Sequence, residues 1–385
     1  MKRTGLLVGV LIVALLAMSV SAAAQSAAIV FDVGGRGDLS FNDMGALGGE
    51  RAARELGVRI REVESATTAD FLPNLRALAR TRSYDVIIGI GFLLQDAIQQ
   101  VAQEFPNQKF ALMDGLADAP NVLSINFADH EGSALMGVIA AITALEYGYD
   151  TVGIVLGIEI PILLRFEIGY RAGIKWAVDR YNEIHGTNKS LRVLHVYTGA
   201  FDDPARGKTA AEAMLAQGAG VIYGVAGATG LGVFEAVEQY ARARGLEVGP
   251  PFAIGVDSAQ DYIAPGFIPV SMMKRVDNGV YTAIKRAVEG TFEGGVLEMT
   301  LAMDGVSAST LEDNLAMFEE AIAAGKKTPA ERDAAIAGIQ RARAAVPQLA
   351  WDLMAELEQL IKSGEFVVPV ALDAQTAEFY RQQLQ

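Results

Sequence analysis

The chain has 385 residues, of which 51% are hydrophobic and 20% are charged, and its formal net charge is −14. This composition supplies enough apolar side chains for one or two packed domains and excludes a disordered chain. The acidic surplus argues against nucleic-acid binding, and the lack of cysteine excludes disulfides, thiolate metal sites and cysteine nucleophiles. Only His130, His185 and His195 occur as histidines, so we expect no histidine-built metal site and no cofactor.

The first 24 residues have the pattern of a secretory signal peptide. Lys2 and Arg3 precede an apolar run from Gly5 to Val20, and small residues follow at 22–24. The alternative is an uncleaved membrane anchor, but the run is shorter than the ~20 residues that span a bilayer. We therefore expect a periplasmic or otherwise extracytoplasmic protein from which residues 1–24 are removed.

Short apolar runs then alternate with amphipathic stretches along the chain. The expected strands are 27–33, 58–63, 85–90, 109–113, 121–127, 151–156, 191–197, 220–226, 251–256 and 268–273. The expected helices are 41–56, with Ser40 as its N-cap, 71–81, 93–105, 130–147, 163–185, 204–217, 231–244 and 277–290. Most of the apolar runs are continuous, as in strands that are buried on both faces of a sheet.

The order of these elements predicts the fold class. Strands that alternate with helices form mostly parallel sheets with right-handed crossovers. About ten strands are more than one compact sheet usually holds. We therefore expect an α/β protein with two doubly wound lobes, and the alternative is a single (β/α)8 barrel.

Polar and aromatic residues gather at the carboxyl ends of the predicted strands, where open parallel sheets bind ligands. Each aspartate or glycine by itself could simply end a strand. Carboxylates accept hydrogen bonds from hydroxyl and amino groups, and aromatic faces stack on planar rings, so the set suits a nucleoside. A nucleotide phosphate would meet three carboxylates and only one lysine. The residues are Asp32, Phe41, Gly91, Phe92, Asp114, Phe201, Gly227, Asp257 and Lys274.

Several motifs give the chain a resemblance to a known family. They are FDVGG at 31–35, GDLSFND at 37–43, GIGFLL at 89–94, FALMDG at 110–115, DHEGS at 129–133, IP at 160–161, RFEIG at 165–169, FDDPA at 201–205, AGATGLG at 226–232, GVDS at 255–258 and KRVD at 274–277. Through these motifs the sequence resembles the basic membrane protein family, the purine nucleoside receptors of bacterial ABC importers. The motifs keep their order over roughly residues 28–290.

The resemblance implies a type I periplasmic binding fold and a role for each motif residue. Two lobes joined by three crossing segments would close on one nucleoside without catalysis. Phe41 would stack on the base, Asp114 would read the base edge, and Asp257 with Lys274 would hold the ribose hydroxyls. The second lobe would add Phe166, Phe201 and Gly227, while Asp32 and Asn42 would touch the ligand or brace its loop. The implied partner of this monomer is an ABC permease in the cytoplasmic membrane.

We expect residues 27–128 together with about 274–300 to form an N-terminal lobe, and residues 129–272 to form a C-terminal lobe. Residues from about 301 to 385 are expected to form a helical extension with a final strand near 364–369. Its amphipathic pattern favours packing on a lobe over a partner-binding module. Many relatives carry a lipobox cysteine that this chain lacks, so we expect no lipid anchor.

Two other functions stay open from the residues alone. The same fold could serve as an extracytoplasmic sensor for a separate signalling partner. Clustered carboxylates could also hydrolyse the N-glycosidic bond of a nucleoside by general acid and base catalysis. The sequence offers no run of aspartates after the first strand that would hold a catalytic cation, which disfavours the hydrolase.

Overall fold

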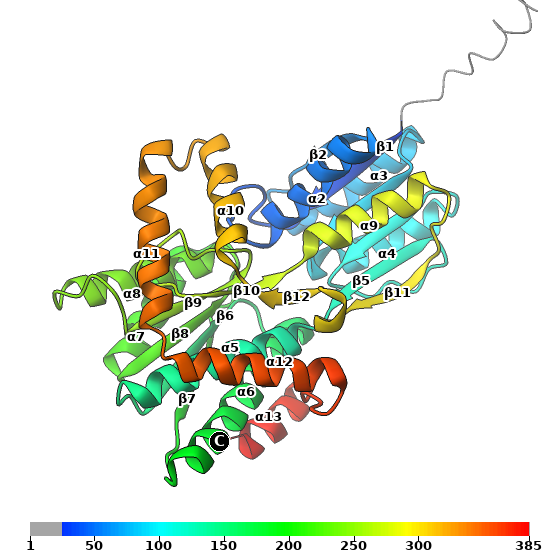
Figure 1. Ribbon diagram of the computed structural model, residues 1–385. Coiled ribbons are helices and arrows are strands. Elements are labelled where there is room, and N and C mark those ends of the chain that lie inside the picture. Colours follow the sequence, from blue (N-terminus) through cyan, green and yellow to red (C-terminus); the bar gives the residue numbers. More distant parts are fainter. Residues whose placement is uncertain (1–24, 385) are drawn as a thin grey trace, which may run out of the picture.

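The computed structural model describes residues 25–384, so the predicted signal peptide lies outside the described residues. Two six-stranded sheets form the cores of two lobes (Figure 1). The first sheet has the order β11 (Gly295–Met299), β5 (Val122–Phe127), β4 (Phe110–Met113), β3 (Val86–Ile90), β1 (Ser26–Phe31) and β2 (Arg59–Val63), and all its pairs are parallel. The two open sheets confirm the two-lobed fold and exclude the barrel.

The second sheet is also parallel apart from one edge strand. Its order is β12 (Val306–Ala308), β10 (Ser271–Lys274), β9 (Phe252–Asp257), β8 (Ala219–Val225), β6 (Thr151–Leu156) and β7 (Arg192–Tyr197). Only β12 runs antiparallel to its neighbour, β10. The chain passes between the sheets after β5, after β10 and after β11. Lys274, the last residue of β10, therefore lies at the junction of the lobes.

The helices cover both faces of each sheet. Those of the first lobe are α2 (Phe41–Leu56), α3 (Phe71–Thr81), α4 (Gln95–Glu104) and α9 (Val276–Val288), with short 3-10 turns η1 (Thr68–Asp70) and η2 (Phe92–Leu94). Those of the second lobe are α5 (Asp129–Glu146), α6 (Pro161–His185), α7 (Pro204–Ala216) and α8 (Thr229–Arg242). No helix within residues 25–384 is both long enough and apolar enough to cross a membrane.

The pattern of apolar residues explains which elements are central. The strands β1, β3 and β4 are mainly apolar and are buried along their whole length. The edge strands β2 and β7 contain only partly buried and exposed residues. The helix α5 is buried on nearly all sides, and α6 packs closely across it. A Cβ atom at Gly173 of α6 would lie 1.9 Å from the carbonyl oxygen of Ala134, so the close approach of these helices requires glycine there.

The C-terminal part differs from the sequence prediction in its strands. The strands β11 and β12 were not predicted, since one holds an exposed, glycine-led segment and the other has only three residues. The helical extension consists of α10 (Leu311–Ala323), α11 (Arg332–Ala345), α12 (Gln348–Ser363) and α13 (Ala374–Gln383), with the turns η3 (Leu301–Met303) and η4 (Pro329–Glu331). The predicted final strand is wrong, because residues 364–373 form no strand and lead into α13. The helices α12 and α13 pack on α5 and α6.

Candidate functional site

A cavity lies between the lobes, at the carboxyl ends of the strands of both sheets. It has a volume of about 670 Å³, counting the part that is open to solvent. All of the residues proposed from the sequence line it, namely Asp32, Phe41, Asn42, Gly91, Phe92, Asp114, Phe166, Phe201, Gly227, Asp257 and Lys274. Sequence reasoning missed Val33, Gly34, Asp38, Leu93, Ile160, Ile162, Leu163, Val225 and Ala226. Of these, Asp38 belongs to the GDLSFND motif and could have been found there.

Phenylalanine rings from both lobes form the apolar part of the cavity. Phe41 begins α2 and Phe92 begins η2, so both project from loops that follow strands of the first sheet. Phe166 lies on α6, and Phe201 lies in the loop between β7 and α7. Phe41, Phe92 and Phe201 keep part of their surface exposed, as expected of rings that face a cavity. A planar ligand would thus contact aromatic faces from two sides of the cleft.

A buried ammonium group organises the polar part of the cavity. Lys274 is 1% exposed, and its Nζ forms an ion pair with Asp114 and lies 2.9 Å from Oδ1 of Asp129. Burial by itself would lower the pKa of Lys274, but Asp114, Asp129 and Asp257 outweigh burial and raise it. Burial raises the pKa of Asp129 to about 7 against the opposing effect of Lys274. The lysine is therefore charged, and it pairs with Asp114 and Asp129 while Asp257 lies close enough to raise its pKa further.

The contact between Ser40 and Asp257 is one of several hydrogen bonds that join the two lobes. Ser40 occupies the N-cap position of α2, as predicted, but its hydroxyl does not cap the helix. Instead Oγ of Ser40 donates to Oδ2 of Asp257, at 3.0 Å. The side chain of Asp38 accepts hydrogen bonds from the backbone N–H groups of Ser40 and Asn42, both at 2.9 Å. Asp38 thus stabilises the start of α2, as the serine hydroxyl would in an ordinary N-cap. The Ser40–Asp257 contact thus holds the first lobe against the second.

Asp32 and Asn42 brace the loop as well as lining the cavity. Oδ1 of Asn42 accepts the backbone N–H of Asp32, and its Nδ2 donates to Asp38 at 3.1 Å. Oδ1 of Asp32 accepts the N–H of Val33 at 2.6 Å. A Cβ atom at Gly91, where φ is +115°, would lie 2.3 Å from Oδ2 of Asp32, so only glycine fits there. Asn42 thus braces the loop and also lines the cavity, so it could contact a ligand from the position that it occupies.

Asp32 gives this site a pH-dependent contribution to stability. Burial raises the pKa of Asp32 from 3.8 to about 7. The folded state then binds more protons than the unfolded state between these values, so stability falls as the pH rises from about 4 to 7. We expect Asp32→Asn to raise the free energy of unfolding at pH 8 by about 1–3 kcal/mol and to leave it nearly unchanged at pH 4. Urea unfolding at both pH values measures this.

The matched control is Asp118→Asn, which changes an exposed carboxylate of the same lobe. This control should follow the wild type at every pH. Parallel pH profiles for Asp32→Asn and the wild type would show that Asp32 is ionised in the folded protein.

No group of three or more histidine, aspartate or glutamate side chains in residues 25–384 is arranged to hold a metal ion.

The family model for PnrA-like substrate-binding proteins of ABC transporters, named Bmp, matches residues 25–331. The chain belongs to this family. The resemblance read from the sequence motifs is therefore confirmed, and the Bmp family consists of substrate-binding proteins rather than enzymes. Proteins of this kind bind small molecules outside the cytoplasm and deliver them to a permease.

Relatives of this Bmp protein include archaeal and bacterial chains. It is 40% identical over 381 residues to an uncharacterized lipoprotein of Pyrococcus abyssi, covering 95% of this chain and 92% of the relative. It is 31% identical over 314 residues to the ABC transporter nucleoside-binding protein BmpA of Lactococcus lactis, covering 78% and 85%. A solved solute-binding protein of an ABC transporter system from Aeropyrum pernix K1 is 40% identical, with a TM-score of 0.83 and coverage of 94% and 97%.

Two consequences follow for this Bmp protein. The lipoprotein names of the Pyrococcus relatives conflict with our expectation of a protein without a lipid anchor, although the printed sequence has no cysteine. The family model ends at residue 331, before α11 begins. The matches to the Pyrococcus abyssi relative and to the Aeropyrum structure cover 95% and 94% of this chain, so they must include most of residues 332–385. The extension is therefore shared with these archaeal proteins.

Proposed function

We propose that this protein is the receptor of an ABC importer that captures a nucleoside, with purines preferred, and delivers it to a membrane permease. The observation that carries the proposal is a single cavity that combines four phenylalanine rings with four buried carboxylates and one buried lysine. A nucleoside has both a planar part and a hydroxylated part, and it needs both kinds of contact. The name of the Lactococcus relative supports this ligand class.

For the base, we propose stacking on Phe41 and a polar contact to Asp114. Phe41 lies at the first-lobe wall of the cavity, with its ring centre 5.3 Å from Nζ of Lys274. Oδ2 of Asp114 pairs with Lys274, while Oδ1 is buried and accepts no hydrogen bond from any residue in 25–384. A buried carboxylate oxygen that accepts no hydrogen bond costs stability. A hydrogen bond from a ligand N–H group to Asp114 would therefore contribute more binding free energy than the same hydrogen bond formed in water.

For the sugar, we propose that Asp257 and Lys274 contact the ribose hydroxyls. Asp257 ends β9 from the second lobe, and Lys274 ends the neighbouring strand β10, so both reach the same point of the cleft. The ammonium group has three N–H donors, two of which face Asp114 and Asp129. The surrounding carboxylates outnumber this single cation, and a phosphate group would meet repulsion and desolvation together. A nucleoside is therefore preferred over a nucleotide.

The first test is a thermal-shift screen of residues 25–385 against nucleosides, free bases, nucleotides, sugars and amino acids. A ligand at about a hundred times its Kd adds about 2.7 kcal/mol to stability, which such a screen detects. We expect large shifts with guanosine, inosine or adenosine, small ones with their 5′-monophosphates, and unchanged nucleoside in the sample afterwards. A shift with sugars or amino acids alone would contradict the proposed ligand class.

Phe41→Ala should weaken nucleoside binding by about 1–3 kcal/mol, which is a rise of about 5- to 150-fold in Kd. The alanine removes the aromatic face of the first lobe and leaves the polar groups in place. Isothermal titration with inosine measures the change. The control is Phe379→Ala on α13, a phenylalanine 56% exposed and absent from the cavity lining. Equal weakening by both variants would mean that Phe41 does not stack on the ligand.

A further inference from the structure

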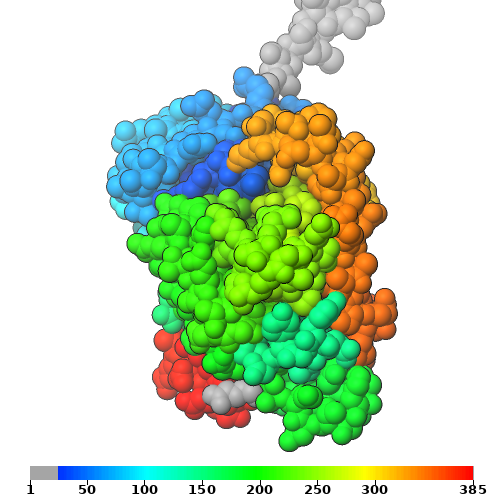
Figure 2. Space-filling view, turned by 90° about the vertical axis from the view of Figure 1, so that its left-hand side faces the viewer, coloured from blue at the N-terminus to red at the C-terminus, as the bar shows by residue number. Residues whose placement is uncertain are grey.

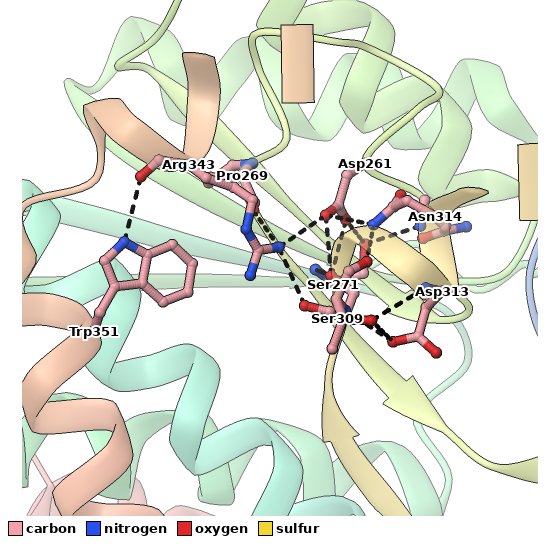
Figure 3. Close-up of polar contacts among 10 residues, drawn as sticks. Asp261, Pro269, Ser271, Ser309, Asp313, Asn314, Arg343 and Trp351 are labelled. Carbon is pink, nitrogen blue, oxygen red and sulfur yellow. Dashed lines mark hydrogen bonds and ion pairs between the residues drawn. The ribbon is translucent and has the colours of Figure 1, made fainter. Parts of the chain in front are cut away.

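A buried carboxylate joins the C-terminal extension to the second lobe. Asp261 is 0% exposed and accepts hydrogen bonds from Ser271 Oγ at 2.6 Å, Ser309 Oγ at 3.0 Å and Asn314 Nδ2 at 2.8 Å (Figure 3). Nη1 of Arg343, on α11, lies 3.5 Å from Oδ2 of Asp261 and donates to the carbonyl oxygen of Ser309 at 3.1 Å. Strand ends, α10 and α11 therefore converge on one aspartate.

Aromatic contacts hold the hairpin that α10 and α11 form: one ties α11 to the next helix, α12, and another fixes α10 to the second lobe. The guanidinium of Arg343 lies 5.0 Å from the ring centre of Trp351, whose Nε1 donates to the carbonyl oxygen of Arg343. On α10, Phe318 packs edge-on against Tyr262, with ring centres 5.7 Å apart. Because Tyr262 and Asp261 are adjacent, α10 and α11 are both attached to the same segment of the second lobe.

The segment that the hairpin holds is also the segment that touches the first lobe. Asp257 accepts from Ser40, and Nε2 of Gln260 donates to the carbonyl oxygen of Leu39 at 2.9 Å. Both contacts lie within four residues of Asp261. By binding Asp261, the hairpin therefore also positions residues 257–260, the segment of the second lobe that contacts the first lobe.

The turn that follows α10 makes a contact of its own with the first lobe. Nζ of Lys326 donates to the carbonyl oxygen of Gly37 at 2.6 Å, in the loop that leads to Phe41. Figure 2 shows α10 and α11 in orange, passing from the blue first lobe down the side of the green second lobe. A second cavity of about 650 Å³ separates α10 from this loop, lined by Arg36, Gly37, Leu39, Asp43, Leu47, Tyr262, Met317, Glu320, Ala321, Ala324 and Lys326. The Lys326–Gly37 contact is thus a polar contact beside a cavity that is open to solvent.

We propose that the hairpin of α10 and α11 is a strap, anchored on the second lobe through Arg343 and Asp261, that stabilises the closed form through Lys326 and Gly37. Arg343 lies beyond residue 331, so it lies outside the part that matches the family model, whereas Asp261 lies inside that part. The strap is a positioning device, because none of these side chains lines the ligand cavity. The proposal rests on the proposed function only in taking a nucleoside as the ligand that drives closure.

The equilibrium between open and closed forms tests the strap directly. Because the chain has no cysteine, Arg80→Cys on α3 and Glu212→Cys on α7 give a single pair of exposed labelling sites, one on each lobe. Single-molecule energy transfer then measures the ratio of open to closed molecules without ligand and with half-saturating inosine. We expect Lys326→Ala to raise this ratio about 3- to 10-fold. Lys327→Ala is the matched control, since Lys327 pairs with Glu331 inside the extension, and its ratio should stay unchanged.

A second variant separates a strap from a merely structural anchor. Arg343→Ala should raise the open fraction as Lys326→Ala does, and the double variant should add little to Arg343→Ala alone, because both residues act through one device. Arg341→Ala, an exposed arginine on the same helix, is the control. Additive effects, or a Lys326→Ala ratio equal to the wild type in both conditions, would overturn the strap. If no nucleoside closed the wild-type protein, the proposed function would be overturned instead. The ratios of open to closed molecules without ligand would still test the strap.

Discussion

Replacing Lys274 with methionine is expected to lower the free energy of unfolding by about 3–5 kcal/mol at pH 7. The methionine keeps the length of the side chain but leaves Asp114, Asp129 and Asp257 buried together without their cation. Burial raises the pKa of Asp129 to about 7 and that of Asp257 to about 6. Since these carboxyl groups take up protons as the pH falls, the loss should be smaller at pH 5 than at pH 7. Urea unfolding at both pH values measures it.

The control for this variant is Lys285→Met, which removes an exposed lysine in the last turn of α9. It should change stability by less than about 0.5 kcal/mol, as is usual for surface positions. Adding Asp129→Asn to Lys274→Met should restore part of the lost stability, because one of the uncompensated charges is removed. A loss that is equal at pH 5 and pH 7 would show that packing, and not charge, is what Lys274 contributes.

The sequence could predict the location of the candidate site because parallel strands bring their carboxyl ends to one edge. Asp32, Asp114 and Asp257 each follow a buried apolar run, and the fold leaves these positions only one place to meet. The same rule cannot separate a ligand contact from a structural contact. Asn42 binds two neighbouring groups of its own loop while it lines the cavity, and such a dual role is visible only in three dimensions.

Other parts of the molecule lie beyond what local patterns can reveal. Asp129 belongs to the DHEGS motif, but its pairing with Lys274 joins residues far apart in the chain. The anchor of the extension likewise joins Asp261 to Arg343, which are 82 positions apart. A three-residue strand such as β12 has too few side chains to show a period. These features depend on long-range packing, so they required the structure.

Asp257→Ala is expected to weaken nucleoside binding by about 2 kcal/mol, or about 30-fold in Kd, while weakening binding of a free base by less than about threefold, which is the share due to its lost contact with Ser40. The reason is the proposed place of Asp257 on the ribose side, where a carboxylate accepts hydroxyl protons that a free base lacks. Titrations with guanosine and guanine measure the two effects separately. The ratio of the two changes in Kd shows whether the ribose or the base of the ligand faces β9.

Ser40→Ala is the control that separates this role from closure of the lobes. Its hydroxyl donates to Asp257 across the cleft, so its removal weakens the closed form whatever the ligand is. Ser40→Ala should therefore weaken guanosine and guanine by similar factors, unlike Asp257→Ala. If Asp257→Ala also weakened both equally, Asp257 would act through the closed form alone, and the sugar would have to lie against other residues of the cavity. The two variants together thus decide how a nucleoside is oriented between the lobes.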